Sequence, residues 1–166
     1  MAKPNRFNFF ALSLGSIIPD LEVPILFLLT GDKWHARSIM HSLLGAFTID
    51  ILIVVLATIF IVPWLLKYLD GKIQNKKIFK FSSFDLREHK SSTGIIIYSG
   101  LIGTVSHVCL DLINHTYNPL TFPVEKYYDL NLVLFNDVQL ANITVWVVMS
   151  GLLIVMTYYW YLKNLL

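Results

Sequence analysis

The sequence predicts an all-α protein: a polytopic helical bundle of about four membrane spans, forming one domain of 166 residues. Two observations on composition predict this class. Hydrophobic residues make up 55% of the chain and charged residues only 14%, whereas soluble proteins carry about 25% charged residues. The mean hydropathy is +0.62. A soluble fold of this size cannot cover so much apolar surface, whereas a bilayer solvates it.

The third observation is that the apolar residues gather in four stretches near the ~20 residues that cross a bilayer. The first stretch, residues 7–29, is interrupted by two prolines and two carboxylates: Pro19, Asp20, Glu22 and Pro24. Because proline disrupts a helix interior, we expect a helix to about Ile18, a break at Pro19-Asp20 and a second short helix. Irregular backbone at membrane depth is tolerated only against protein or a wet cavity, so the break itself indicates a site.

The other spans are expected over residues 42–66, 94–113 and 138–162. The second contains Asp50, and the third contains His107 and Asp111. The fourth has no ionisable residue before Lys163. The second and third spans therefore carry chemistry that the fourth lacks.

Positive charges predict the orientation of the spans. Residues 67–93 and 114–137 are the main segments between spans. With four spans, the N-terminus, the 67–93 loop and the C-terminus share one side, which holds ten of the 13 Lys and Arg residues. The positive-inside rule places that side in the cytoplasm. We therefore expect both termini and the basic 67–93 loop in the cytoplasm of a prokaryotic-type plasma membrane, with the 114–137 loop extracytosolic.

Ionisable residues of three segments are expected at similar depth. At ~1.5 Å per residue, Asp50 lies about 12 Å and His107 about 9 Å below the outer ends of their helices. Asp20 follows a helix that starts on the inner side, which places it roughly 20 Å up, in the outer half. His41 opens the second span at the outer surface. A charge at membrane depth costs several kcal/mol unless it has a partner, so this convergence favours a shared site.

The residue types favour a divalent metal, with zinc as the expected ion. Four-residue steps place His107, Asp111 and His115 on one stripe of a helix, and imidazole and carboxylate are ligands that zinc favours. The ligands are expected among five residues: Asp20, His41, His107, Asp111 and His115. Asp50 and Ser42 are expected to orient the ligands, although a helix-packing role for Asp50 and a plain helix-end role for His115 stay open.

Three motifs occur in order along the chain: Gly15-Ser16-Ile17-Ile18-Pro19-Asp20, then His41-Ser42-Leu43-Leu44-Gly45, then His107-x3-Asp111-x3-His115 followed by Pro119-Leu120-x2-Pro123. Together they resemble the membrane-bound metal-dependent hydrolase family, which includes the LexA-regulated inner-membrane proteins, over about residues 7–125. The His-x3-Asp element also resembles part of the zinc-ligand pattern of zinc-dependent phospholipases C. The resemblance implies a helical membrane enzyme that uses a divalent metal for hydrolysis. Family members often carry a histidine before the Pro-Asp motif, where this chain has Asn5, Phe7, Asn8 and Phe9.

The preferred hypothesis is a membrane-embedded metal-dependent hydrolase with its site near the extracytosolic face. A bound metal would activate water, and Asp20 or Glu22 would serve as general base. The depth of the site favours an amphipathic substrate among the membrane lipids, such as a lipid-like phosphoester. The alternative is a non-enzymatic subunit that joins other membrane subunits in a complex and keeps a structural metal or a buried polar network. A nucleic-acid partner is not expected, since no basic patch is interleaved with aromatic residues.

Overall fold

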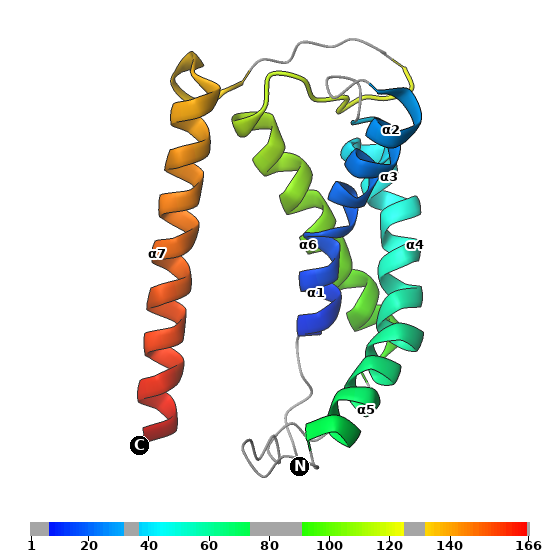
Figure 1. Cartoon of the computed structure of the whole chain (residues 1–166), viewed down its shortest axis with the longest axis vertical. Coiled ribbons are helices and arrows are strands. Elements are labelled where there is room, and N and C mark those ends of the chain that lie inside the picture. The colour runs from blue at the N-terminus through cyan, green and yellow to red at the C-terminus, as the bar shows by residue number, and fades with distance from the viewer. Residues whose placement is uncertain (1–6, 32–36, 74–90, 125–131, 166) are drawn as a thin grey trace. The chain divides into compact units, whose positions relative to one another are not determined.

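The computed structural model describes residues 7–31, 37–73, 91–124 and 132–165, and within these ranges the chain forms helices and no strand (Figure 1). The predicted all-α class is therefore confirmed. The chain divides into two compact units. The first comprises Met1–Cys109 and Pro119–Tyr128, and the second Leu110–Asn118 and Asp129–Leu166.

Three helical segments among the described residues are long and apolar enough to cross a membrane: Leu43–Tyr68, Thr93–Asn114 and Val138–Val155. The number rises to four if the bent pair Phe9–Gly15 and Ile18–Thr30 forms one span. These segments overlap the four predicted stretches, and their length and apolar composition make the chain an integral membrane protein. Most of the predicted basic loop, residues 74–90, lies outside the described residues.

The first span is built of three helical segments: α1 (Phe9–Gly15), η1 (Ile18–Leu21) and α2 (Glu22–Thr30). The predicted break is present as a bend of 43°. It lies at Ser16-Ile17, slightly before the expected position at Pro19-Asp20. The reason is that Pro19 occupies the first turn of η1, where a missing N–H removes no intrahelical hydrogen bond.

The second span is also segmented. A 3-10 turn, η2 (Ile39–His41), precedes it, and the span itself consists of α3 (Leu43–Phe47), α4 (Ile49–Leu56), the π-helical turn η3 (Ala57–Ile61) and α5 (Val62–Ile73). A kink at Thr48 (φ −124°, ψ −84°) separates α3 from α4. The wide turn η3 ends two residues before Pro63, whose ring would otherwise clash with the preceding helical turn.

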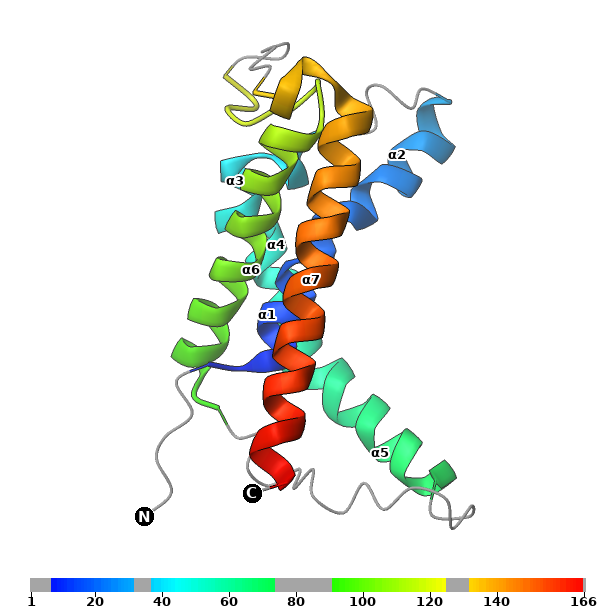
Figure 2. The same ribbon diagram turned by 90° about the vertical axis from the view of Figure 1, so that its left-hand side faces the viewer.

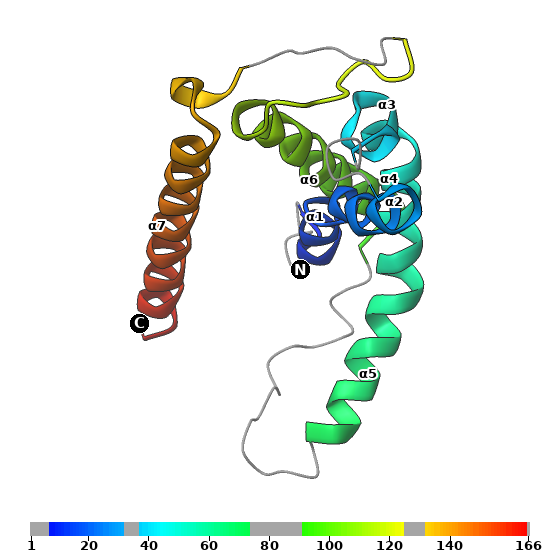
Figure 3. The same ribbon diagram turned by 45° about the horizontal axis from the view of Figure 1, so that its top comes forward.

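The long helix α6 (Thr93–Asn114) packs closely against α1 in the first unit (Figure 2, Figure 3). Gly15 and Gly103 meet at the crossing, where a Cβ added to Gly103 would lie only 2.9 Å from the Cα of Gly15. Thr104, fully buried, donates from its hydroxyl to the carbonyl of Ala46 in α3 at 3.2 Å. α6 is thus held against both the first and the second span.

The second unit contains the last turn of α6 and the long helix α7 (Val138–Leu165). Asp137 caps α7, and its Oδ1 accepts from the backbone N–H groups of Gln139 at 2.8 Å and Leu140 at 3.1 Å. Such a cap satisfies backbone donors that the first turn of a helix leaves without partners.

Candidate metal centre

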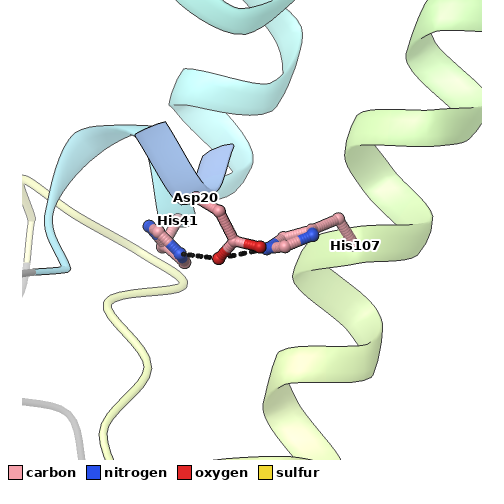
Figure 4. A group of neighbouring side chains, drawn as sticks. All are labelled: Asp20, His41 and His107. Carbon is pink, nitrogen blue, oxygen red and sulfur yellow. Dashed lines mark ion pairs between the residues drawn. The ribbon is translucent and has the colours of Figure 1, made fainter. Parts of the chain in front are cut away.

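Asp20 of η1, His41 of η2 and His107 of α6 converge in the first unit (Figure 4). One ligand atom of each lies within 4.8 Å of the other two. Asp20 Oδ1 lies between the two rings, 3.6 Å from His41 Nε2 and 3.5 Å from His107 Nε2. The fold therefore brings together three of the five residues expected to hold a metal.

His107 is oriented by the backbone at the break in the first span. Its Nδ1 lies 2.9 Å from the carbonyl oxygen of Ser16. A carbonyl oxygen can only accept, so this nitrogen carries the hydrogen, and in the neutral ring Nε2 carries the lone pair. The carbonyl of Ser16 is available because α1 ends at Gly15, and the last carbonyls of a helix have no intrahelical partner. The bend thus turns Nε2 of His107 toward Asp20.

The side chain of Glu22 orients His41 in the same way that the Ser16 carbonyl orients His107. His41 is buried, and its Nδ1 lies 3.1 Å from Oε2 of Glu22. A carboxylate accepts at this position, so a neutral His41 turns its Nε2 lone pair toward Asp20. The two rings lie with centroids 5.6 Å apart at an interplanar angle of 67°. Both imidazoles therefore present the same nitrogen to one carboxylate oxygen.

Glu22, predicted as a general base, is buried and hydrogen-bonded to the backbone. It is only 6% exposed, and its Oε2 also accepts from the backbone N–H groups of Ser38 at 2.9 Å and Met40 at 3.2 Å. Ser42, predicted to orient a ligand, is the N-cap of α3, and its hydroxyl oxygen accepts from the N–H of Gly45 at 3.0 Å. Glu22 and Ser42 thus fix the backbone on both sides of His41.

Asp50 lies in the first turn of α4 and is fully buried. Neither of its carboxylate oxygens has a hydrogen-bond partner among the described residues. Asp50 interacts electrostatically with Glu22 and His41. The Nδ1 atom of His41 is bonded to Glu22 and not to Asp50, so the structure shows no hydrogen bond by which Asp50 would orient this ring.

Asp111 and His115 lie outside this group of three and belong to the second unit. His115 Nε2 lies 3.7 Å from Asp111 Oδ1, as their place on one helical stripe predicts. Four residues of an α-helix rise about 6 Å, so Asp111 lies a full turn beyond His107 along α6.

Asn118 is a polar residue that the sequence interpretation missed. It is buried, and its Nδ2 donates to the carbonyls of Asp111 at 2.8 Å and His115 at 3.0 Å. Asn118 lies four residues past the end of α6 at Asn114, beyond the position where an asparagine commonly ends a helix, so the local sequence gave no direct signal for this role. Asn118 closes the carboxyl end of α6.

The charges around the three converging residues favour a bound cation. A lone pair of Nε2 that faces a carboxylate oxygen is repulsive unless a cation or a proton lies between the two atoms. Asp20 and Glu22 bring two carboxylates to this region, Asp50 adds a buried carboxyl group, and Arg37 is a cation that acts electrostatically on Asp20. Tetrahedral zinc with bonds of about 2.0–2.1 Å separates neighbouring ligand atoms by about 3.4 Å. The two N–O distances from Asp20 Oδ1, 3.5 and 3.6 Å, are close to that separation.

Comparison with known proteins identifies a family but no characterised relative. No curated protein and no solved structure matches the chain. The match is to a family described as a domain of unknown function, DUF4184, and it covers residues 1–164. Since the match spans nearly the whole sequence, the chain belongs to the DUF4184 family.

Proposed function

We propose that this protein is a membrane-embedded metal-dependent hydrolase that binds one divalent metal, zinc, through Asp20, His41 and His107. The observation that carries the proposal is the shared orientation of the two histidines. Each has Nδ1 bonded to an oxygen acceptor and Nε2 turned to Asp20 Oδ1. A histidine whose second nitrogen is bonded to a carboxylate or a carbonyl is the usual form of a metal-ligating histidine.

The ligand set supports an open metal site. Catalytic zinc has three protein ligands and a position for water, whereas structural zinc has four protein ligands. The Asp20 side chain is 57% exposed, so the oxygen side of the group is accessible. Two histidines and one carboxylate also form the ligand set of non-haem Fe(II) sites. Zinc is the ion proposed because hydrolysis requires no redox change and because the motifs resemble a hydrolase family.

When bound, zinc would supply a Lewis acid and an activated water. The residues of the chain would bind and orient this ion, with His41 and His107 fixed by Glu22 and by the Ser16 carbonyl. Of the two predicted general bases, Asp20 is the exposed one. Glu22 is buried and already accepts three hydrogen bonds, which favours a positioning role over proton transfer.

The surroundings of Asp20 support an amphipathic substrate. Ile17 and Leu21, which flank Asp20 in the first span, are 57% and 49% exposed. In a bilayer such side chains face acyl chains. His107 lies seven residues before the end of α6 at Asn114, about 10 Å along the helix axis. A lipid-like phosphoester whose head group reaches this depth, from the side that the charge distribution predicts to be extracytosolic, fits both features.

Elemental analysis of the purified chain in detergent tests metal binding. We expect about one zinc per chain in the wild type and loss of zinc in both His41→Ala and His107→Ala. His115→Ala is the matched control, because His115 lies in the separate pair with Asp111, and it should keep its zinc. A wild type without metal, or His107→Ala with unchanged zinc content, would contradict the proposal.

Hydrolysis is tested on phosphoester lipids in mixed micelles. Turnover should disappear after chelation, return with added zinc, and be absent in His107→Ala. Stoichiometric zinc that resists chelation, without turnover of any phosphoester lipid, would favour the non-enzymatic subunit with a structural metal.

A further inference from the structure

Glu22 joins three parts of the centre through a single oxygen atom. Oε2 accepts from the N–H of Ser38, the N–H of Met40 and Nδ1 of His41, at 2.9, 3.2 and 3.1 Å. We propose that Glu22 is a positioning residue whose negative charge holds His41 as the Nδ1–H tautomer and thereby sets the metal affinity of the centre. The part of this inference that concerns metal rests on the proposed function.

The charge of Glu22 is what these contacts require. Three N–H groups converge on one oxygen, and an ionised carboxylate makes shorter and stronger hydrogen bonds than a neutral acceptor does. Glu22 is also the first residue of α2, where the helix dipole favours a negative charge. Because Glu22 is buried, water cannot replace the interactions that the carboxylate makes.

The two histidines differ in what fixes them. His107 is held by the backbone carbonyl of Ser16, which remains when the Ser16 side chain is substituted. His41 depends on the side chain of Glu22. A free neutral imidazole populates both tautomers, and in the Nε2–H tautomer the nitrogen that faces Asp20 cannot bind a metal. His107 therefore serves as an internal reference for any effect of Glu22 on His41.

The substitution that isolates the charge is Glu22→Gln. Glutamine keeps the length and one oxygen acceptor, but it loses the charge and has an NH2 group in place of the second oxygen. Removing the carboxylate partner of a metal-ligating histidine costs 10–100-fold in metal affinity. We expect the zinc dissociation constant, measured by competition with a chromophoric chelator, to rise by about this factor in Glu22→Gln.

Nitrogen NMR of 15N-histidine-labelled, metal-free protein tests the tautomer directly. Signals are assigned from the His41→Gln and His107→Gln variants. In the wild type we expect both residues as Nδ1–H tautomers. In Glu22→Gln the His41 signals should shift toward a mixture of tautomers while the His107 signals stay unchanged. Ser16→Ala, which removes a side-chain hydroxyl but keeps the carbonyl that His107 uses, is the control and should change neither histidine.

The following outcomes would overturn the proposal or one of its parts. Unchanged His41 signals in Glu22→Gln would overturn it, and so would an equal change at His41 and His107, since that would indicate a general loss of structure. A wild type that binds no zinc would defeat the proposed function but leave the tautomer result standing. Zinc affinity in Glu22→Gln within twofold of the wild type would defeat the link between Glu22 and the metal.

Discussion

Replacing Gly103 by alanine should weaken the metal centre from a distance. Gly103 lies one helical turn before His107, at the crossing of α1 and α6. An added Cβ would lie 2.9 Å from both the Cα of Gly15 and the backbone nitrogen of Ser16. Because carbon atoms rest about 3.5–4.0 Å apart, α1 has to retreat by roughly 0.6–1 Å. The carbonyl of Ser16 moves with it, and its 2.9 Å bond to His107 lengthens to about 3.5 Å or more.

Two quantities should change in Gly103→Ala. The free energy of unfolding responds to two opposing effects, and the zinc dissociation constant responds to the orientation of His107. Alanine gains about 0.5–1 kcal/mol over glycine in a helix, whereas overpacking costs about 1–3 kcal/mol. The free energy of unfolding should therefore fall by no more than about 2.5 kcal/mol. Loss of the bond that orients His107 should raise the zinc dissociation constant about 10–100-fold. Chelator competition measures the second quantity and unfolding in mixed detergent measures the first.

Gly94→Ala is the matched control in the same helix. The nearest atom to a Cβ at Gly94 is the hydroxyl oxygen of Ser92 at 3.9 Å, an ordinary contact. This variant should bind zinc like the wild type and unfold at least as late. If Gly103→Ala also keeps wild-type zinc affinity and stability, the close crossing of α1 and α6 does not position His107, and the reasoning is refuted.

Three further outcomes are expected. Asn8→Ala should lower the free energy of unfolding by about 1–2 kcal/mol, because the Asn8 side chain caps α1 and its Nδ2 donates to the hydroxyl of Ser91; an unchanged free energy of unfolding would contradict this. Thr104→Val removes a buried hydrogen bond and should lower the free energy of unfolding by about 0.6–1 kcal/mol, as is typical in a membrane protein. The control Thr144→Val, at an exposed site, should cause no measurable change. Equal losses in the two variants would contradict a stabilising contribution of the buried Thr104 hydrogen bond. In a Cys109→Ala background, a cysteine at Lys76 should react with an impermeant maleimide only after permeabilisation, and labelling of intact cells would reverse the orientation.

The spans could be predicted because hydropathy is a local property. A stretch of about 20 apolar residues is long enough to cross a bilayer whatever its neighbours do, and the described helices follow the predicted stretches. Counting along helices of fixed rise also predicted a similar depth for Asp20, His41, Asp50 and His107, of which Asp20, His41 and His107 converge in the structure. The exact position of the bend was less predictable, because a proline is accommodated in the first turn after a break as readily as at the break itself.

The contacts of single atoms could not be predicted in this way. The pattern His107-x3-Asp111 suggested a shared metal, but a common stripe on a helix does not mean a common depth. Glu22 illustrates the same limit, since its three donors come from a segment that folds back onto α2. The separation of Glu22 and His41 along the sequence does not predict that the two side chains are in contact.

The sequence alone determined that the chain is a helical membrane protein and which ionisable residues enter its apolar spans, because both follow from composition and local spacing. The tertiary structure decided which of those residues meet, and which nitrogen of each histidine faces Asp20. Those outcomes depend on the close crossing of α1 and α6 and on the end of α1 at Gly15, which frees one carbonyl for His107. They also depend on the return of residues 38–41 to Glu22. Apart from the end of α1, these are contacts between segments far apart in the chain, and local spacing carries no information about them.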